Sequence, residues 1–174
     1  MTGHGLSGVN AAVDTLEALG LIDVDRSGRA NAVRINSEMF VKPDDPVTAI
    51  PQPGYHAPVR KLLSELTERI DGEVGVVLFG SVARGTADRT SDIDLFVVVE
   101  EDRMQAQREA HAIEQEIAGE RFDGERYEAH IVVETGESAA SHDRIGDIFA
   151  EGLTLQDSQA LAAVKREVFD GGAD

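Results

Sequence analysis

Two acidic residues in the middle of the chain, Asp92 and Asp94, have the type and spacing to hold a metal ion. If Ile93 to Val99 is a strand, both carboxylates project from one face with their Cα atoms about 7 Å apart, and Ile93 and Leu95 point towards the core. Like charges repel at that distance, and a divalent cation resolves the conflict. Mg²⁺, or Mn²⁺ in its place, suits a sparse carboxylate set completed by substrate phosphates and water. The alternative is a solvated strand face.

A phosphate-binding turn precedes these carboxylates in the sequence. A buried strand ends at Phe79, and Gly80-Ser81 turns into a short helical segment whose first amides form an anion site. Gly80 lets a ligand approach the backbone, because it has no side chain. Ser81 offers a hydroxyl, Arg84 offers a bidentate charge for phosphate, and Ser91 completes the nucleotide-binding candidates.

Together these residues resemble a known signature. Gly80-Ser81-x-x-Arg84-Gly85 followed by Ser91-Asp92-Ile93-Asp94-Leu95 resembles the motif of the DNA polymerase beta-like nucleotidyltransferase superfamily, closest to its minimal members. The resemblance implies a metal-bound nucleoside triphosphate, with Gly80 and Ser81 holding its phosphates and Asp92 and Asp94 binding Mg²⁺. Nucleotidyl transfer would release pyrophosphate.

The chain departs from the superfamily at the third carboxylate, which in those enzymes lies on a later strand and acts as general base. In Arg126-Tyr-Glu-Ala-His-Ile-Val-Val133, His130 stands where the family usually has Asp, and Glu128 lies two residues earlier on the same face. Glu128 could supply the carboxylate after a small shift, and His130 could itself accept a proton. If neither does, the domain binds nucleotide without turning it over.

The hydrophobic pattern predicts an α/β fold in which a small mixed sheet is flanked by helices, as in nucleotidyltransferases. Residues 59–174 form this domain, and residues 40–58, which hold all five prolines, form a stiff linker. The predicted helices cover residues 59–70, 101–118, 143–150 and 160–169. The predicted strands cover residues 74–79, 93–99 and 126–133, with a short apolar piece at 153–155.

Residues 1–39 predict a helix capped by Ser7 and then a β-hairpin around Ser27-Gly28. This order resembles the recognition helix and wing of a winged helix-turn-helix domain. Such a domain needs two further helices upstream. We therefore expect a truncated N-terminus, a start codon assigned too late, or a packing partner for this winged-helix remnant.

The composition of the chain bears on its location and on its binding partners. The 174 residues include no Cys and carry a formal charge of −17, with only three lysines. No apolar stretch is long enough to cross a bilayer, and the first residues lack the basic and apolar regions of a signal peptide, so we expect a cytoplasmic protein away from membranes. The acidic, lysine-poor composition favours a halophilic source, and it opposes nucleic-acid binding unless basic patches or cations offset it.

The sequence therefore predicts an enzyme that moves a nucleoside monophosphate from a nucleoside triphosphate to an acceptor hydroxyl. The acceptor is a small molecule or a protein side chain, such as one on a toxin partner. The alternative is a transcriptional regulator whose degenerate transferase domain senses nucleotides, and which binds DNA only if the winged helix is complete. A homodimer is also left open.

Overall fold

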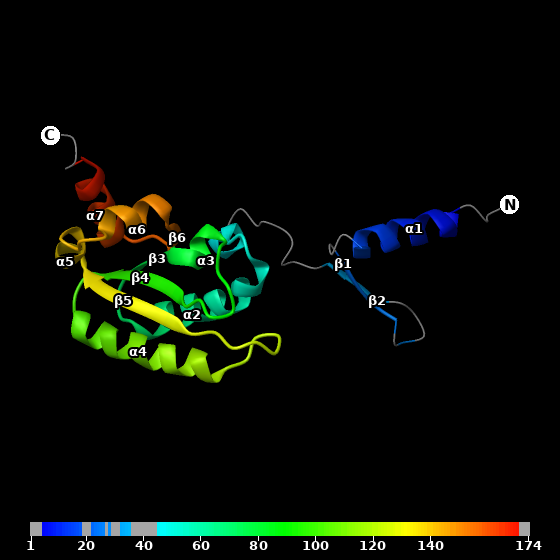
Figure 1. Cartoon of the computed structure of the whole chain (residues 1–174), viewed down its shortest axis with the longest axis horizontal. Coiled ribbons are helices and arrows are strands. Elements are labelled where there is room, and N and C mark those ends of the chain that lie inside the picture. Colours follow the sequence, from blue (N-terminus) through cyan, green and yellow to red (C-terminus); the bar gives the residue numbers. More distant parts are fainter. Residues whose placement is uncertain (1–4, 19–21, 27, 29–31, 36–44, 171–174) are drawn as a thin grey trace. The chain divides into compact units, whose positions relative to one another are not determined.

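The chain forms two separate units in a computed structural model that describes residues 5–18, 22–26, 28, 32–35 and 45–170 (Figure 1). The first unit covers Met1–Lys42 and the second covers Pro43–Asp174. No described helix has the length and apolar character needed to span a membrane.

The first unit contains helix α1 (Gly5–Ala18) and a hairpin of strands β1 (Ile22–Asp25) and β2 (Ala32–Ile35). The strands pair antiparallel, with Ile22 opposite Ile35. The Arg26 guanidinium donates to both carboxylate oxygens of Glu17 at 2.6 Å, which ties the hairpin to the helix. The predicted helix and hairpin are therefore present. The helix begins at Gly5, so the prediction that Ser7 caps it is wrong.

The second unit is built on a four-stranded mixed sheet in the order β5-β4-β3-β6. Strand β3 (Val74–Phe79) pairs antiparallel with both β4 (Ile93–Val99) and β6 (Leu153–Gln156). Strand β5 (Ala129–Thr135) lies parallel to β4 and forms the edge. The predicted small mixed sheet flanked by helices is confirmed.

Helices cover both faces of this sheet (Figure 1). One face packs on α2 (His56–Arg69) and α4 (Arg103–Gly119), and the other packs on α5 (Gly136–Ala140), α6 (Ile145–Glu151) and α7 (Gln159–Asp170). Alternate residues of β4 divide between these layers, as a two-residue period requires. Leu95 and Val97 join the α2–α4 core, and Phe96 and Val98 join the other.

The proline-rich segment does not behave as a linker after Asp45. It contains two short 3₁₀ helices, Pro46–Ala49 and Pro53–Tyr55, and three of its apolar side chains are buried in the core: Val47, Ile50 and Tyr55. The buried His56 ring also bonds the Ile50 carbonyl at 2.9 Å. The prediction of a linker over residues 40–58 is therefore wrong from Asp45 onwards, because proline suits the first turn of a helix as well as an extended chain.

Smaller differences lie at element ends. Strand β5 begins at Ala129 and not at Arg126, and the sequence analysis missed α5. This five-residue helix begins with a capping box, in which the Thr135 and Ser138 side chains bond each other's backbone amides. Strands β3 and β4 have the bounds that their apolar runs predict.

Candidate active site

Gly80 and Asp94 approach each other closely where β3 turns into α3 (Gly80–Arg84). Phe79 pairs with Asp94 across the β3–β4 ladder, so the next residue along the chain lies beside the Asp94 side chain. Gly80 has φ 75°, a left-handed conformation, and a Cβ atom added there would collide with an Asp94 carboxylate oxygen. Any other residue at position 80 would strain the backbone and push the Asp94 carboxylate aside, so glycine suits this position.

The Asp94 carboxylate lies in an electrostatic environment set by burial and by several charges. Burial is the largest cause, and it raises the pKa of Asp94 above its ordinary value. His130 lowers that pKa, Asp92 raises it further, and Arg144 and Arg84 lower it. His130 and the two arginines therefore offset part of the cost of ionising this half-buried carboxylate.

Strand β5 brings the two candidate bases to the same end of the sheet as the carboxylate pair. Because β4 and β5 run parallel in register, His130 lies directly beside Asp94. One step earlier, the Ile93 amide donates to the Glu128 carbonyl at 2.9 Å, which places Glu128 beside Asp92. The structure thus gathers Asp92, Asp94, Glu128 and His130 on adjacent chain segments, with Asp94 half-buried and the other three exposed.

The predicted phosphate ligands differ in their availability. Ser81 lies in the first turn of α3 and is partly exposed. Arg84, in contrast, forms an ion pair with Glu151 of α6 at 2.9 Å. Ser91 is also engaged, because its hydroxyl accepts from the Asp88 amide at 2.9 Å.

Arg144 is a cation that the sequence analysis treated only as part of a helix start. It immediately precedes α6 and its charge acts on Asp94 more strongly than that of Arg84. Among the described residues, the Arg144 side chain has no ion-pair partner. Its signal in the sequence was weak, since it stands far from the Gly80 and Asp94 motifs.

The donor set suits Mg²⁺ only if the substrate contributes ligands. Across the described part of the chain, no three His, Asp or Glu side chains are grouped so as to hold a metal ion by themselves. Mg²⁺ is usually bound through one or two carboxylates, with phosphate oxygens and water filling its other positions. Asp92 and Asp94 fit that pattern, and a cation would offset the cost of ionising Asp94.

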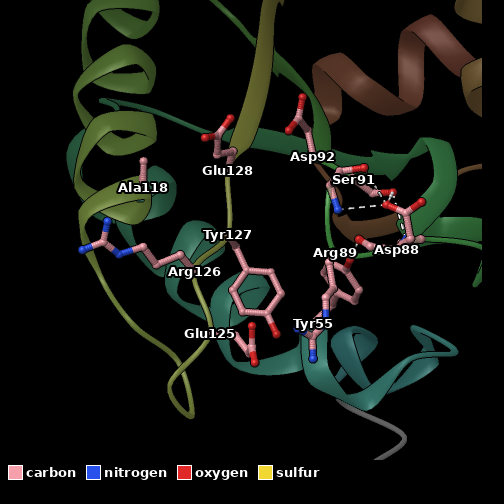
Figure 2. A pocket seen from close by; sticks show the side chains of 12 residues that line it. Tyr55, Asp88, Arg89, Ser91, Asp92, Ala118, Glu125, Arg126, Tyr127 and Glu128 are labelled. Atoms are coloured by element: carbon pink, nitrogen blue, oxygen red, sulfur yellow. Dashed lines mark hydrogen bonds between the residues drawn. The ribbon is translucent and has the colours of Figure 1, made fainter.

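A cavity of about 690 Å³ adjoins the carboxylates (Figure 2). Asp92 and Glu128 lie at one end of it, and Tyr127 projects between the β5 side and the loop that carries Asp88 and Ser91. The complete lining is Tyr55, Ala87, Asp88, Arg89, Thr90, Ser91, Asp92, Ala118, Glu125, Arg126, Tyr127 and Glu128. Sequence reasoning missed both tyrosines, because Tyr55 and Tyr127 lie far apart in the chain and outside the motif.

Comparison with protein families gives a match to the nucleotidyltransferase domain over residues 59–151, more than half of the chain. The chain belongs to this family. The matched stretch of the nucleotidyltransferase domain runs from within α2 to the end of α6, and it includes Gly80, Asp92, Asp94, Glu128 and His130. No curated protein and no solved structure matched the chain in the corresponding searches.

The compact unit that contains the matched stretch also includes elements outside it. Strand β6 completes the sheet beside β3, and α7 covers the face that carries Phe96. The 3₁₀ segment before α2 contributes Tyr55 to the cavity and to the core. The recognised fold is thus extended at both ends by segments that pack on it.

Proposed function

We propose that this domain transfers a nucleoside monophosphate from a nucleoside triphosphate to an acceptor hydroxyl in a reaction that requires Mg²⁺ or Mn²⁺. The observation that carries the proposal is the close approach of Gly80 to Asp94, with Asp92 two residues away. This geometry holds the Asp94 carboxylate against the turn after β3, at the same end of the sheet as Asp92, where two carboxylates could share a cation with substrate phosphates.

The chemistry is an in-line displacement. The acceptor oxygen attacks the α-phosphorus, the bond from that phosphorus to the pyrophosphate oxygen breaks, and pyrophosphate leaves. Glu128 takes the hydroxyl proton in our assignment, and His130 is the alternative base. The bound metal, held by Asp92 and Asp94, would neutralise charge on the phosphate oxygens.

We assign the triphosphate to Gly80, Ser81 and the two arginines that act on Asp94. Arg144 is the more available cation, whereas Arg84 must share its charge with Glu151. Ser91 acts mainly by shaping the loop before Asp92, since its hydroxyl is bonded to Asp88. Guanidinium groups suit this role because they bind phosphate oxygens in a bidentate manner.

The test is transfer of label from nucleoside triphosphates labelled at the α-phosphate, supplied with Mg²⁺ or Mn²⁺ and with lysate of the host organism. High potassium chloride is included because a formal charge of −17 favours a protein from a cell with a salt-rich cytoplasm. The control is the double variant Asp92→Asn, Asp94→Asn, with its fold checked by circular dichroism. Label that reaches an acceptor only with the wild type supports transfer, and equal labelling by both proteins would refute it.

A second candidate is metal-dependent nucleotide sensing without transfer. The observation that favours it is His130, which occupies the register position beside Asp94 where the family resemblance leads one to expect a carboxylate. In that case the helix and hairpin of the first unit would pass on the effect of nucleotide binding. To act as a DNA-binding regulator, the protein would need a complete winged helix. Nucleotide binding that depends on Asp92 and Asp94, with no label transferred to any acceptor, would favour this candidate.

A further inference from the structure

The cavity beside Asp92 and Glu128 is chemically distinct from the phosphate-binding turn. Its volume of about 690 Å³ falls within the range of small-molecule sites. It opens on Asp92 and Glu128, whereas Gly80, Ser81 and Arg144 lie outside its lining. A molecule in this cavity would therefore reach the candidate base without occupying the turn after β3.

Tyr127 gives the cavity a fixed aromatic surface. Its ring packs edge-on against Tyr55 at 5.2 Å between centroids and against Phe122 at 6.1 Å. Tyr55 is itself held by its hydroxyl, which donates to the Asp88 carbonyl at 3.0 Å. Rings fixed in this way lose little entropy when a second ring stacks on them.

Four carboxylates supply hydrogen-bond acceptors to the cavity: Asp88, Asp92, Glu125 and Glu128. The Glu125 and Glu128 side chains bond no other side chain or amide among the described residues, so their oxygens are available. The Asp88 carboxylate is fixed by the Thr90 amide and hydroxyl at 2.8 Å each, and these bonds hold its pKa below the ordinary value. A ligand that pairs with these carboxylates must therefore bring donors, because ionised carboxylates only accept hydrogen bonds.

Charge limits the ligand further. Four carboxylates line the cavity against two guanidiniums, Arg89 and Arg126, and the Arg126 guanidinium extends towards the α4 side of Figure 2, away from Tyr127. Burial raises the pKa of Tyr127, as do Glu125 and Asp123, so its hydroxyl stays protonated. The cavity therefore disfavours phosphorylated or carboxylated ligands and favours neutral or cationic ones.

We propose that this cavity is the acceptor subsite and that it takes a small ring compound bearing hydroxyl or ammonium donors. This inference rests on the proposed transferase function. The ring stacks on Tyr127, its donors bond to Glu125 and Glu128, and one hydroxyl is presented towards Asp92. That hydroxyl oxygen bonds to the α-phosphorus as pyrophosphate departs, and its proton passes to Glu128.

The test separates a small acceptor from a macromolecular one. A lysate of the host is divided by ultrafiltration, and each fraction is given to the full chain with α-labelled nucleoside triphosphate and Mg²⁺. We expect label in a small product formed with the filtrate. Label only on retained protein or nucleic acid would overturn the acceptor class while leaving transferase function intact, and no label with either fraction would overturn both.

Variants of Tyr127 then test the location. Tyr127→Leu keeps apolar bulk for the fold but removes the stacking face, and the amount of filtrate needed for half-maximal rate should rise about tenfold. Tyr127→Phe keeps the ring and should produce a smaller rise, and Glu137→Gln on α5 serves as a remote control. Mg²⁺-dependent nucleotide binding should be unchanged in Tyr127→Leu. Unaltered half-saturation in Tyr127→Leu, or a parallel loss of nucleotide binding, would overturn the assignment.

Discussion

The two halves of the candidate site are built in different ways. Gly80 and Asp94 lie on or next to the two inner strands of the sheet, and a close approach leaves no room for any side chain at position 80. Glu128 and Tyr127 lie just before the edge strand, where side chains are exposed or partly exposed. The half that we assign to the nucleotide is thus constrained by packing, whereas the half that we assign to the acceptor is less constrained.

This difference has a physical cause. A central strand is paired on both sides, so a shift of its carboxylate must disturb two ladders. An edge strand is paired on one side only, and a side chain at its start can change without altering the core. We therefore expect substitutions in the inner half to change both chemistry and stability, and substitutions in the outer half to change chemistry alone.

The largest expected effect is a loss of turnover on substitution of Glu128, in the outer half of the site. Glu128→Gln should lower the rate of transfer about a thousandfold, because it removes the proposed base while keeping the size of the side chain. Nucleotide binding and the melting temperature should remain as in the wild type. His130→Asn should change the rate little. Single-turnover label transfer measures both, and the reverse ranking would move the base to His130.

Gly80→Ala tests whether substitutions in the inner half change both activity and stability. The added Cβ atom would displace the Asp94 carboxylate, and a misplacement of about 1 Å at a reacting group costs about a hundredfold in rate. The left-handed backbone adds about 1–2 kcal/mol of destabilisation. Activity and urea unfolding should therefore both report a loss.

Gly124→Ala is the matched control for that variant. Gly124 has φ 87°, close to the 75° of Gly80, but an added Cβ atom would meet nothing within 4 Å. Both variants should lose similar stability, and only Gly80→Ala should lose activity. An equal loss of activity in the two variants would mean that backbone strain, and not contact with Asp94, is what matters.

The same contrast explains what the sequence could predict. Strands β3 and β4 could be predicted because each contains a continuous uncharged run, residues 74–79 and 95–99, and Gly80 and Asp94 lie directly next to these runs. The cavity could not be predicted from the sequence, because Tyr55 and Tyr127 are brought together by tertiary packing of the segment before α2. The linker prediction for that segment is wrong because prolines are compatible with short helices as well as with an extended chain, and Val47, Ile50 and Tyr55 pack into the core.

The two arginines whose charges act on Asp94, Arg144 and Arg84, give a smaller, graded test. Arg144→Gln should weaken Mg²⁺-dependent nucleotide binding about tenfold, as expected for one charge-assisted contact. Arg84→Gln should weaken it less, because Glu151 already shares that charge. Equilibrium dialysis with labelled nucleotide measures both, with Arg108→Gln on α4 as the control. A greater loss of nucleotide binding in Arg84→Gln than in Arg144→Gln would mean that Arg84, the arginine of the sequence motif, is the main phosphate ligand.

The smallest expected effect is a gain in stability without metal. Because burial raises the pKa of Asp94, the folded state holds this proton more tightly than the unfolded state, and the wild type loses stability as the pH rises through the carboxyl range. Asp94→Asn removes that penalty, so the variant should unfold at a higher urea concentration than the wild type at pH 7. The difference should close as the pH falls towards the ordinary carboxyl pKa of about 3.9.

Added Mg²⁺ should reverse the order of the two proteins. A cation bound by Asp92 and Asp94 stabilises the folded wild type by mass action, and Asp94→Asn has lost half of that pair. Asp92→Asn separates the two effects, because Asp92 is exposed and its neutralisation relieves little burial cost while it still weakens the metal site. If Asp94→Asn were less stable than the wild type at pH 7 without metal, the Asp94 carboxylate would stabilise the fold by itself. It would then not be a destabilising group that a bound cation compensates.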